Sequence, residues 1–247
     1  MFKKEKETNN NQIQEEKPMK EVEENHSAGN LRVYNLIILD ESGSMSAIRQ
    51  EALTGVNETL QTIRMAKEEH SNQEQFVTLV TFDTGHYNEI YKGTPAGDAI
   101  DITPDQYWPN GGTPLYDTMG RAITELRNHI EYINSKNEPR PIVLVTIITD
   151  GYENASREYN GPAIKALIEE MRKQDWVFTY IGANQDVEKV AASMAINNHM
   201  AFAADSEGTK AMFCKDRRAR SKFFDKADAF FRGHIDKTKF EEDYFEG

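Results

Sequence analysis

Cysteine is almost absent from this sequence: Cys214 is the single cysteine among 247 residues. One cysteine excludes an internal disulfide framework and a zinc cluster built from cysteines, and it suits a reducing compartment. No apolar run approaches the ~20 residues that a membrane-spanning helix needs. The charged start, MFKKEK, is not followed by the apolar stretch of a signal peptide. We therefore expect a cytoplasmic protein with no membrane insertion.

Basic residues are also scarce relative to acidic ones. Lys and Arg number 29 against 41 Asp and Glu, which gives a net charge of −12. General binding to nucleic acid needs clustered Lys and Arg that release counterions, so this balance argues against nucleic acid as a partner. The most basic stretch, residues 215–226, could dock an acidic partner or RNA, but the solvated face of a helix is the simpler interpretation.

Common catalytic signatures are missing from the chain. It contains no G-x-S-x-G elbow, no P-loop and no G-x-G-x-x-G motif. The six histidines show neither an HExxH motif nor another paired spacing, which argues against a zinc site. The sequence therefore does not predict any of the enzyme classes that these motifs mark.

The chain divides into three parts by composition. Residues 1–29 are mostly Lys, Glu, Asn and Gln, with too few apolar side chains to offset the entropy of ordering, so we expect a disordered tail. A helix that forms on a partner is the alternative for this tail. Residues 30–233 have the alternating pattern of one folded domain. Residues 234–247 are short and acidic, and we expect them to fray, although Phe240 and Phe245 could dock.

The middle part predicts an α/β fold. Apolar runs rich in β-branched residues indicate strands buried on both faces, at 34–39, 76–82, 142–149 and 176–181. Residues 87–91 follow the second run after a short turn and are predicted to pair with it antiparallel. Amphipathic stretches indicate helices at 48–65, 115–133, 164–171, 187–195 and 206–232. We therefore predict a doubly wound, Rossmann-like, mostly parallel sheet with one antiparallel edge strand and helices on both faces.

Polar side chains and glycines gather where these strands end. Asp40-Glu41-Ser42-Gly43-Ser44 follows the first run, Asp150-Gly151 follows the third, and Asn110-Gly111-Gly112-Thr113-Pro114 leads into a helix. In an open α/β sheet, ligands bind beyond the carboxyl ends of the strands, so we expect the three segments to meet at one rim. Two carboxylates and three hydroxyls would then face one another, and such oxygen ligands suit Mg²⁺ or Mn²⁺.

These three segments carry a family resemblance. Asp40-x-Ser42-x-Ser44 after an apolar strand resembles the metal-ion-dependent adhesion site of von Willebrand factor A (vWA) domains. Gly112-Thr113 and Thr149-Asp150-Gly151 are similar to the other two loops of that site, in the same order, and the resemblance covers residues 32–232. The chain is also more similar to bacterial stand-alone members, such as those of tellurite-resistance gene clusters, than to the adhesive ectodomains of animals.

The resemblance implies a role for each residue. Ser42 and Ser44 would ligate the metal through their hydroxyls, Thr113 would be a switchable ligand, and Asp40 and Asp150 would act mainly through waters and hydrogen bonds. Mg²⁺ is the expected ion, with Mn²⁺ or Ca²⁺ as substitutes. Because most of these direct ligands are neutral, the ion would keep much of its positive charge. That charge would favour binding of a carboxylate from an Asp or Glu of a protein partner. The implied function is a metal-dependent protein-interaction module without catalysis; the partner's identity and the oligomeric state stay undetermined.

Two other functions stay open on the residues alone. A metal-dependent phosphohydrolase could use Asp40 as a nucleophile, although the matching pattern would be DxD and the second position here is Ser42. Alternatively, the rim residues only cap turns and helices, because Ser44 and Thr113 before Pro114 both suit helix N-termini.

The neighbours of these residues have simpler expected roles. We expect Glu41 and Glu153 to be solvated or to tune affinity, and Asp117 to cap the dipole of its own helix. Tyr107 and Trp108 could be exposed partner contacts or buried side chains, and the sequence does not separate the two.

Overall fold

The computed structural model describes residues 30–133, 140–241 and 244–245, so the predicted disordered tail at 1–29 lies outside it. Its strands form one six-stranded sheet in the order β3-β2-β1-β4-β5-β6. They are β1 (Leu31–Asp40), β2 (Gln73–Phe82), β3 (Tyr87–Pro95), β4 (Ile142–Thr149), β5 (Trp176–Gly182) and β6 (Asn198–Ala201). Strand β3 pairs antiparallel with β2 at one edge, and the other pairs are parallel. The predicted fold class is confirmed.

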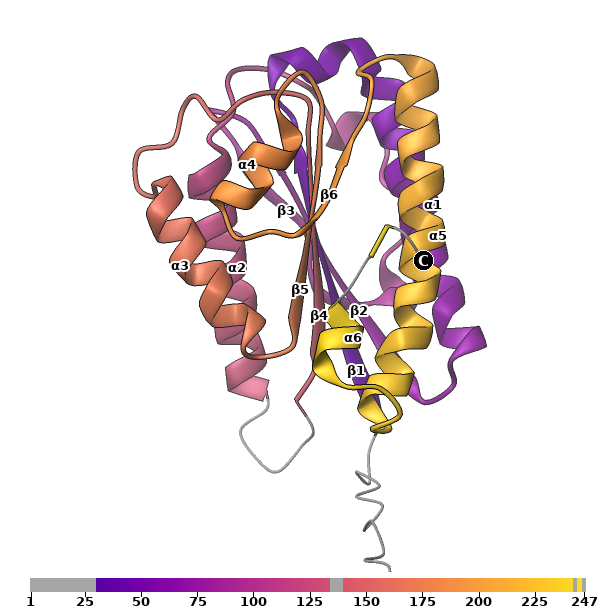
Figure 1. The fold of residues 1–247 in the computed structure, drawn as a ribbon. Helices are drawn as coiled ribbons and strands as arrows, with labels where there is room; N and C mark the ends of the chain where they lie inside the picture. Colours follow the sequence, from indigo (N-terminus) through magenta and orange to yellow (C-terminus); the bar gives the residue numbers. More distant parts are fainter. Residues whose placement is uncertain (1–29, 134–139, 242–243, 246–247) are drawn as a thin grey trace, which may run out of the picture.

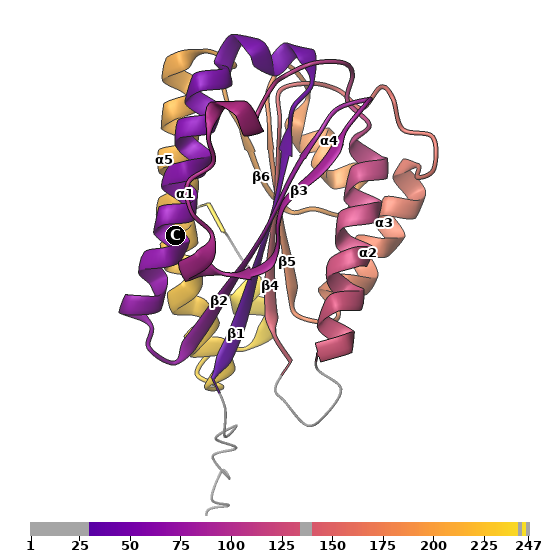
Figure 2. The same ribbon diagram turned by 180° about the vertical axis from the view of Figure 1, so that it is seen from behind.

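Helices cover both faces of the sheet. Helices α1 (Arg49–Glu69) and α5 (Ser206–Phe231) lie on one face, and α2 (Leu115–Ile133), α3 (Gly161–Arg172) and α4 (Val187–Ser193) lie on the other (Figures 1 and 2). Each face has its own cluster of buried apolar residues. Because β1 and β4 are central and covered on both sides, they are almost wholly buried, which explains their continuous apolar sequences. No helix within the described residues has both the length and the apolar character needed to cross a membrane.

The strand register aligns the ends that carry the polar loops. Asp40 pairs with Phe82, Leu39 pairs with Ile148, and Thr149 pairs with Gly182. Strands β1, β2, β4 and β5 therefore finish at nearly the same level. The side chains that follow them must meet at this rim of the sheet.

A short strand and a short α-helix were not predicted. Strand β6 has only four residues, Asn-His-Met-Ala, whose mixed pattern resembles neither a buried nor an alternating strand. Helix α6 (Lys237–Glu241) lies in the segment expected to fray, yet Phe240 and Tyr244 are buried against the α5 side of the core. The described residues after position 233 therefore pack onto the core of the domain.

A buried polar network lies beneath α5. The side chain of Arg220 is wholly buried and donates to Asn35 Oδ1 on β1 (3.1 Å), Thr146 Oγ1 on β4 (2.8 Å) and Asp216 Oδ2 (3.2 Å). The hydroxyl of Tyr244 donates to the other carboxylate oxygen of Asp216 at 3.0 Å. Helix α5 is thus tied to two central strands and to the C-terminal segment by hydrogen bonds between buried side chains.

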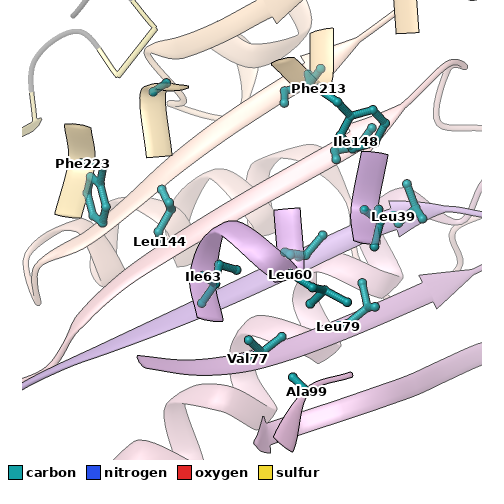
Figure 3. Packing of buried hydrophobic residues seen from close by; sticks show 14 of the residues in the cluster. Leu39, Leu60, Ile63, Val77, Leu79, Ala99, Leu144, Ile148, Phe213 and Phe223 are labelled. Atoms are coloured by element: carbon teal, nitrogen blue, oxygen red, sulfur yellow. The ribbon is translucent and has the colours of Figure 1, made fainter. Parts of the chain in front are cut away.

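Helices α1 and α5 pack closely through Gly55. In Figure 3, Leu60 and Ile63 of α1 lie in the same cluster as Phe213 and Phe223 of α5, over the strand side chains. A Cβ atom placed on Gly55 would lie 2.1 Å from Phe213 Cδ2, far inside van der Waals contact. The glycine is therefore required by the distance between the helices.

This packing gives a stability prediction. Gly55→Ala is expected to lower the free energy of unfolding by about 1–3 kcal/mol, because Phe213 must move within a packed core. Urea denaturation measures the change. The control is Gly97→Ala, since a Cβ atom at Gly97 meets nothing within 4 Å. Equal unfolding midpoints for the two variants would contradict the proposed close packing.

Candidate metal centre

The carboxylate of Asp40 organises the first loop of the rim. Its side chain is wholly buried at the end of β1. Asp40 Oδ1 accepts the amide of Ser42 at 2.7 Å, and Oδ2 accepts the hydroxyl of Thr149 at 2.6 Å. One carboxylate thus stabilises the loop that follows β1 and links this loop to the neighbouring strand β4.

Two serine hydroxyls and a second carboxylate meet beside it. The oxygens Ser42 Oγ and Ser44 Oγ lie 3.2 Å apart, and the Ser44 hydroxyl donates to Asp150 Oδ1 at 2.5 Å. Ser42 and Asp150 are buried, whereas Ser44 is exposed. The two serines lie in one loop and Asp150 lies in another, 106 positions after Ser44, and the strand register brings the two loops together.

Thr113 borders the same space from the third loop. A Cβ atom placed on Gly151 would lie 3.6 Å from Ser44 Oγ and 3.8 Å from Thr113 Oγ1. Both hydroxyls therefore lie beside the same face of Gly151, within van der Waals distance of a Cβ atom placed there. The structure thus gathers all five predicted side chains, Asp40, Ser42, Ser44, Thr113 and Asp150, at one rim.

The loop that carries Thr113 is held by its neighbours. The amide of Thr113 donates to Asn154 Oδ1 at 2.8 Å, and the amide of Asn154 donates back to the carbonyl of Thr113 at 3.1 Å. The amide of Gly112 donates to Thr84 Oγ1 at 2.5 Å, and the amide of Gly43 donates to the carbonyl of Gly111 at 3.0 Å. Each of the other rim loops therefore contributes to placing Thr113.

Sequence reasoning did not assign Thr149 and Asn154 to the site. Thr149 belongs to the Thr149-Asp150-Gly151 segment that resembles a loop of the vWA metal site. Its position opposite Asp40 follows from the pairing of β1 with β4. Asn154 has no sequence signal, because a loop asparagine four residues after Asp150 is ordinary. Its role depends on a reciprocal contact that only the folded loops create.

Three acidic neighbours of the rim make loop contacts that the sequence did not predict. Glu41 is only 7% exposed and its carboxylate accepts the amide of Trp108, so the expectation of a solvated side chain is wrong. Glu153 accepts the amides of Tyr116 at 3.0 Å and Ser156 at 2.8 Å, which ties its loop to the start of α2. Asp117 lies in the first turn of α2 as predicted. Its carboxylate also accepts three loop amides, from Arg157, Glu158 and Tyr159.

Burial makes charge unfavourable on both central carboxylates. Burial raises the pKa of Asp40 to about 6, and burial also raises the pKa of Asp150. Nearby positive charge would stabilise both ionised carboxylates, because an opposite charge within a few ångströms favours the charged form. A cation at the rim would therefore offset the cost of burying these two charges.

The donor chemistry fits a hard divalent cation. The gathered side chains offer oxygen only, from hydroxyls and carboxylates, which suits Mg²⁺, Mn²⁺ or Ca²⁺ and not a soft metal. Within the described residues, no group of three or more His, Cys, Asp or Glu side chains is arranged to hold a metal. The rim of Asp40, Ser42, Ser44, Thr113 and Asp150 is therefore the candidate metal centre.

No protein-family model matches the chain, and no curated protein matches its sequence. Solved structures are similar in fold. The pilus adhesin SpaC of Lactobacillus rhamnosus GG aligns with a TM-score of 0.53 at 16% identity, over 79% of this chain and 30% of that chain. Proximal thread matrix protein 1 of the mussel byssus aligns with a TM-score of 0.52 at 14% identity, over 78% of this chain and 47% of that chain.

A third structure aligns over almost all of its own length. The vWF domain of the pilus tip protein Mfa5 of Porphyromonas gingivalis gives a TM-score of 0.50 at 10% identity, over 79% of this chain and 97% of that domain. The chain spans less than half the length of the other two proteins. At such low identities the likeness concerns the fold alone. The sheet order and these alignments together show that the chain has the fold of the von Willebrand factor A domain.

Proposed function

We propose that this protein is a divalent-metal-dependent interaction module that binds a carboxylate of a protein partner. The observation that carries the proposal is that Ser44 Oγ contacts both Ser42 Oγ and Asp150 Oδ1 and lies, with Thr113 Oγ1, beside Gly151. Mg²⁺ is the proposed ion, because the donors are all hard oxygens.

Each side chain has a proposed role. The hydroxyls of Ser42, Ser44 and Thr113 would hold the ion, and Asp40 and Asp150 would support it through waters and hydrogen bonds. Asp40 would chiefly position Ser42 and Thr149, which it already contacts. When bound, the ion would supply a coordination position for an Asp or Glu of the partner.

The geometry favours binding over catalysis. A phosphohydrolase would need Asp40 free to attack, but its side chain is buried and both of its oxygens accept hydrogen bonds. A purely capping role is also disfavoured for the serines. Ser42 makes no side-chain capping hydrogen bond, and the N-cap of α1 is Ile48 and not Ser44. We therefore propose that the protein has no catalytic activity of its own.

The proposed place of action is the cytoplasm of a bacterium. The single cysteine suits a reducing compartment. The resemblance to stand-alone bacterial vWA proteins supports the same setting.

The direct test is a calorimetric titration of Mg²⁺ and Mn²⁺ into protein stripped with EDTA. Thr113→Ala is expected to weaken metal affinity at least about tenfold, because it removes one oxygen donor while the backbone contacts with Asn154 stay. Thr62→Ala is the control, since the hydroxyl of the partly exposed Thr62 lies on α1 outside the rim and donates to the carbonyl of Glu58. Equal affinities for the two variants would contradict the role given to Thr113. No saturable binding to wild-type protein would contradict the metal site itself.

A further inference from the structure

Two exposed aromatic side chains stand on the loops that build the metal centre. Trp108 is 66% exposed and lies five positions before Thr113, and Tyr152 is 56% exposed and lies two positions after Asp150. The exposed aromatic Tyr132, in contrast, lies at the far end of α2. Exposed aromatics of this size are the side chains most often found as anchors in protein interfaces.

Trp108 is held in place through both its ring and its backbone. The guanidinium carbon of Arg49 lies 4.5 Å from the centre of the indole ring, and the Trp108 amide donates to the carboxylate of Glu41. Arg49 also donates to the carbonyls of Tyr107 at 2.9 Å and Pro104 at 2.5 Å. The exposed ring is therefore preorganised, so a partner that covers it loses little conformational entropy.

The same segment is coupled to the metal centre. Tyr107 is wholly buried, and its hydroxyl donates to the carbonyl of Asp40 at 2.8 Å. The amide of Asn110 donates to the carbonyl of Glu41 at 2.8 Å. Trp108 is thus fixed relative to Ser42 and Ser44 by contacts on both of its flanks. A ligand at the rim would meet the indole ring in a constant position.

We propose that Trp108 is the apolar anchor of the partner-binding surface and that Tyr152 borders this surface on the Asp150 side. The occupant is a partner segment with one Asp or Glu next to an aliphatic or aromatic side chain. The single acid would reach the metal centre, and the apolar neighbour would cover the indole ring. Further acids are unfavourable because the exposed Asp105 lies three positions before Trp108 in a chain of net charge −12. This inference rests on the function proposed above.

The test uses the full chain and a random peptide library displayed on phage. Peptides are bound in Mg²⁺ and eluted with EDTA, and the affinity of one selected peptide is then measured by fluorescence anisotropy. We expect the selected peptides to share an acid beside an apolar residue. Trp108→Ala is expected to weaken binding at least about tenfold, the loss typical of an anchor aromatic. Tyr152→Ala is expected to weaken binding less.

Controls separate the anchor role of Trp108 from the metal-dependent binding proposed above. Tyr132→Ala removes an aromatic that is 83% exposed but lies away from the rim, and it is expected to bind like wild type. A thermal melt checks that Trp108→Ala is folded. Peptides that need Mg²⁺ but bind Trp108→Ala as tightly as wild type would overturn the anchor role and leave the metal-dependent function standing. A library that yields no EDTA-eluted peptides would overturn the proposed function and the anchor role with it.

Discussion

Asp40→Asn is expected to stabilise the metal-free protein at neutral pH and to abolish its stabilisation by Mg²⁺. Burial raises the pKa of Asp40 from 3.8 to about 6, which means that the folded state resists ionising this side chain. A difference of this size costs about 3 kcal/mol of stability once the carboxyl is ionised. Asparagine carries no charge, still accepts the Ser42 amide through Oδ1, and can donate to the hydroxyl of Thr149.

The sign of the pH dependence follows from the raised pKa. Because the folded protein binds this proton more tightly than the unfolded chain does, the stability contributed by Asp40 is fully present below pH 3.8 and is lost as the pH rises to about 6. The difference in stability between Asp40→Asn and wild type should therefore be small near pH 4 and largest above pH 6. Urea denaturation in EDTA across this range measures it.

Melting temperatures with added Mg²⁺ test whether Asp40 contributes to metal binding. Binding to the folded state raises the melting temperature of wild type. Asp40→Asn should show no such rise, because it removes the negative charge that favours a bound cation while the loop contacts stay. Asp98→Asn, at an exposed position outside the rim, is the control for removing a carboxylate. A variant that is less stable than wild type at pH 7 without metal would show that the charge of Asp40 is not the cost inferred from its burial.

Such a cost is understandable if the site is built for binding. Asp40 and Asp150 are both buried at the rim, where their charges are unfavourable without a cation. The apolar burial of the central strands β1 and β4, which helices cover on both faces, offsets the cost of these two buried carboxylates. The rim where the loops converge is therefore less stable without a cation than it would be with neutral side chains, as is common at functional sites.

The fold and the five rim residues could be predicted because each has a local signal. Strands β1 and β4 are buried on both faces, so their sequences are continuously apolar, and the polar residues that follow must lie at the carboxyl edge. The roles of Glu41 and Asn154 could not be predicted. Both depend on backbone groups from distant loops, the Trp108 amide and the Thr113 backbone, and no local pattern marks such partners. Strand β6 escaped prediction because four residues carry too little periodicity.

Asp216→Ala is expected to cause the largest loss of stability of any change considered, about 3–5 kcal/mol. Removing this carboxylate leaves the Arg220 charge wholly buried with only neutral partners, Asn35 and Thr146. It also leaves the hydroxyl of Tyr244 without its acceptor and so loosens the C-terminal segment from α5. Denaturation in urea, followed by far-UV circular dichroism, measures the loss.

Two further variants decide whether the buried charge is the cause. Arg232→Ala breaks a pair of the same i,i+4 spacing on exposed surface near the end of α5, and it should change stability by less than about 1 kcal/mol. The double variant Asp216→Leu with Arg220→Met removes both charges and should recover much of the loss, since apolar side chains of similar volume replace buried ion pairs well. If the double variant is no more stable than Asp216→Ala, the loss comes from packing around α5 and not from an unpaired buried arginine.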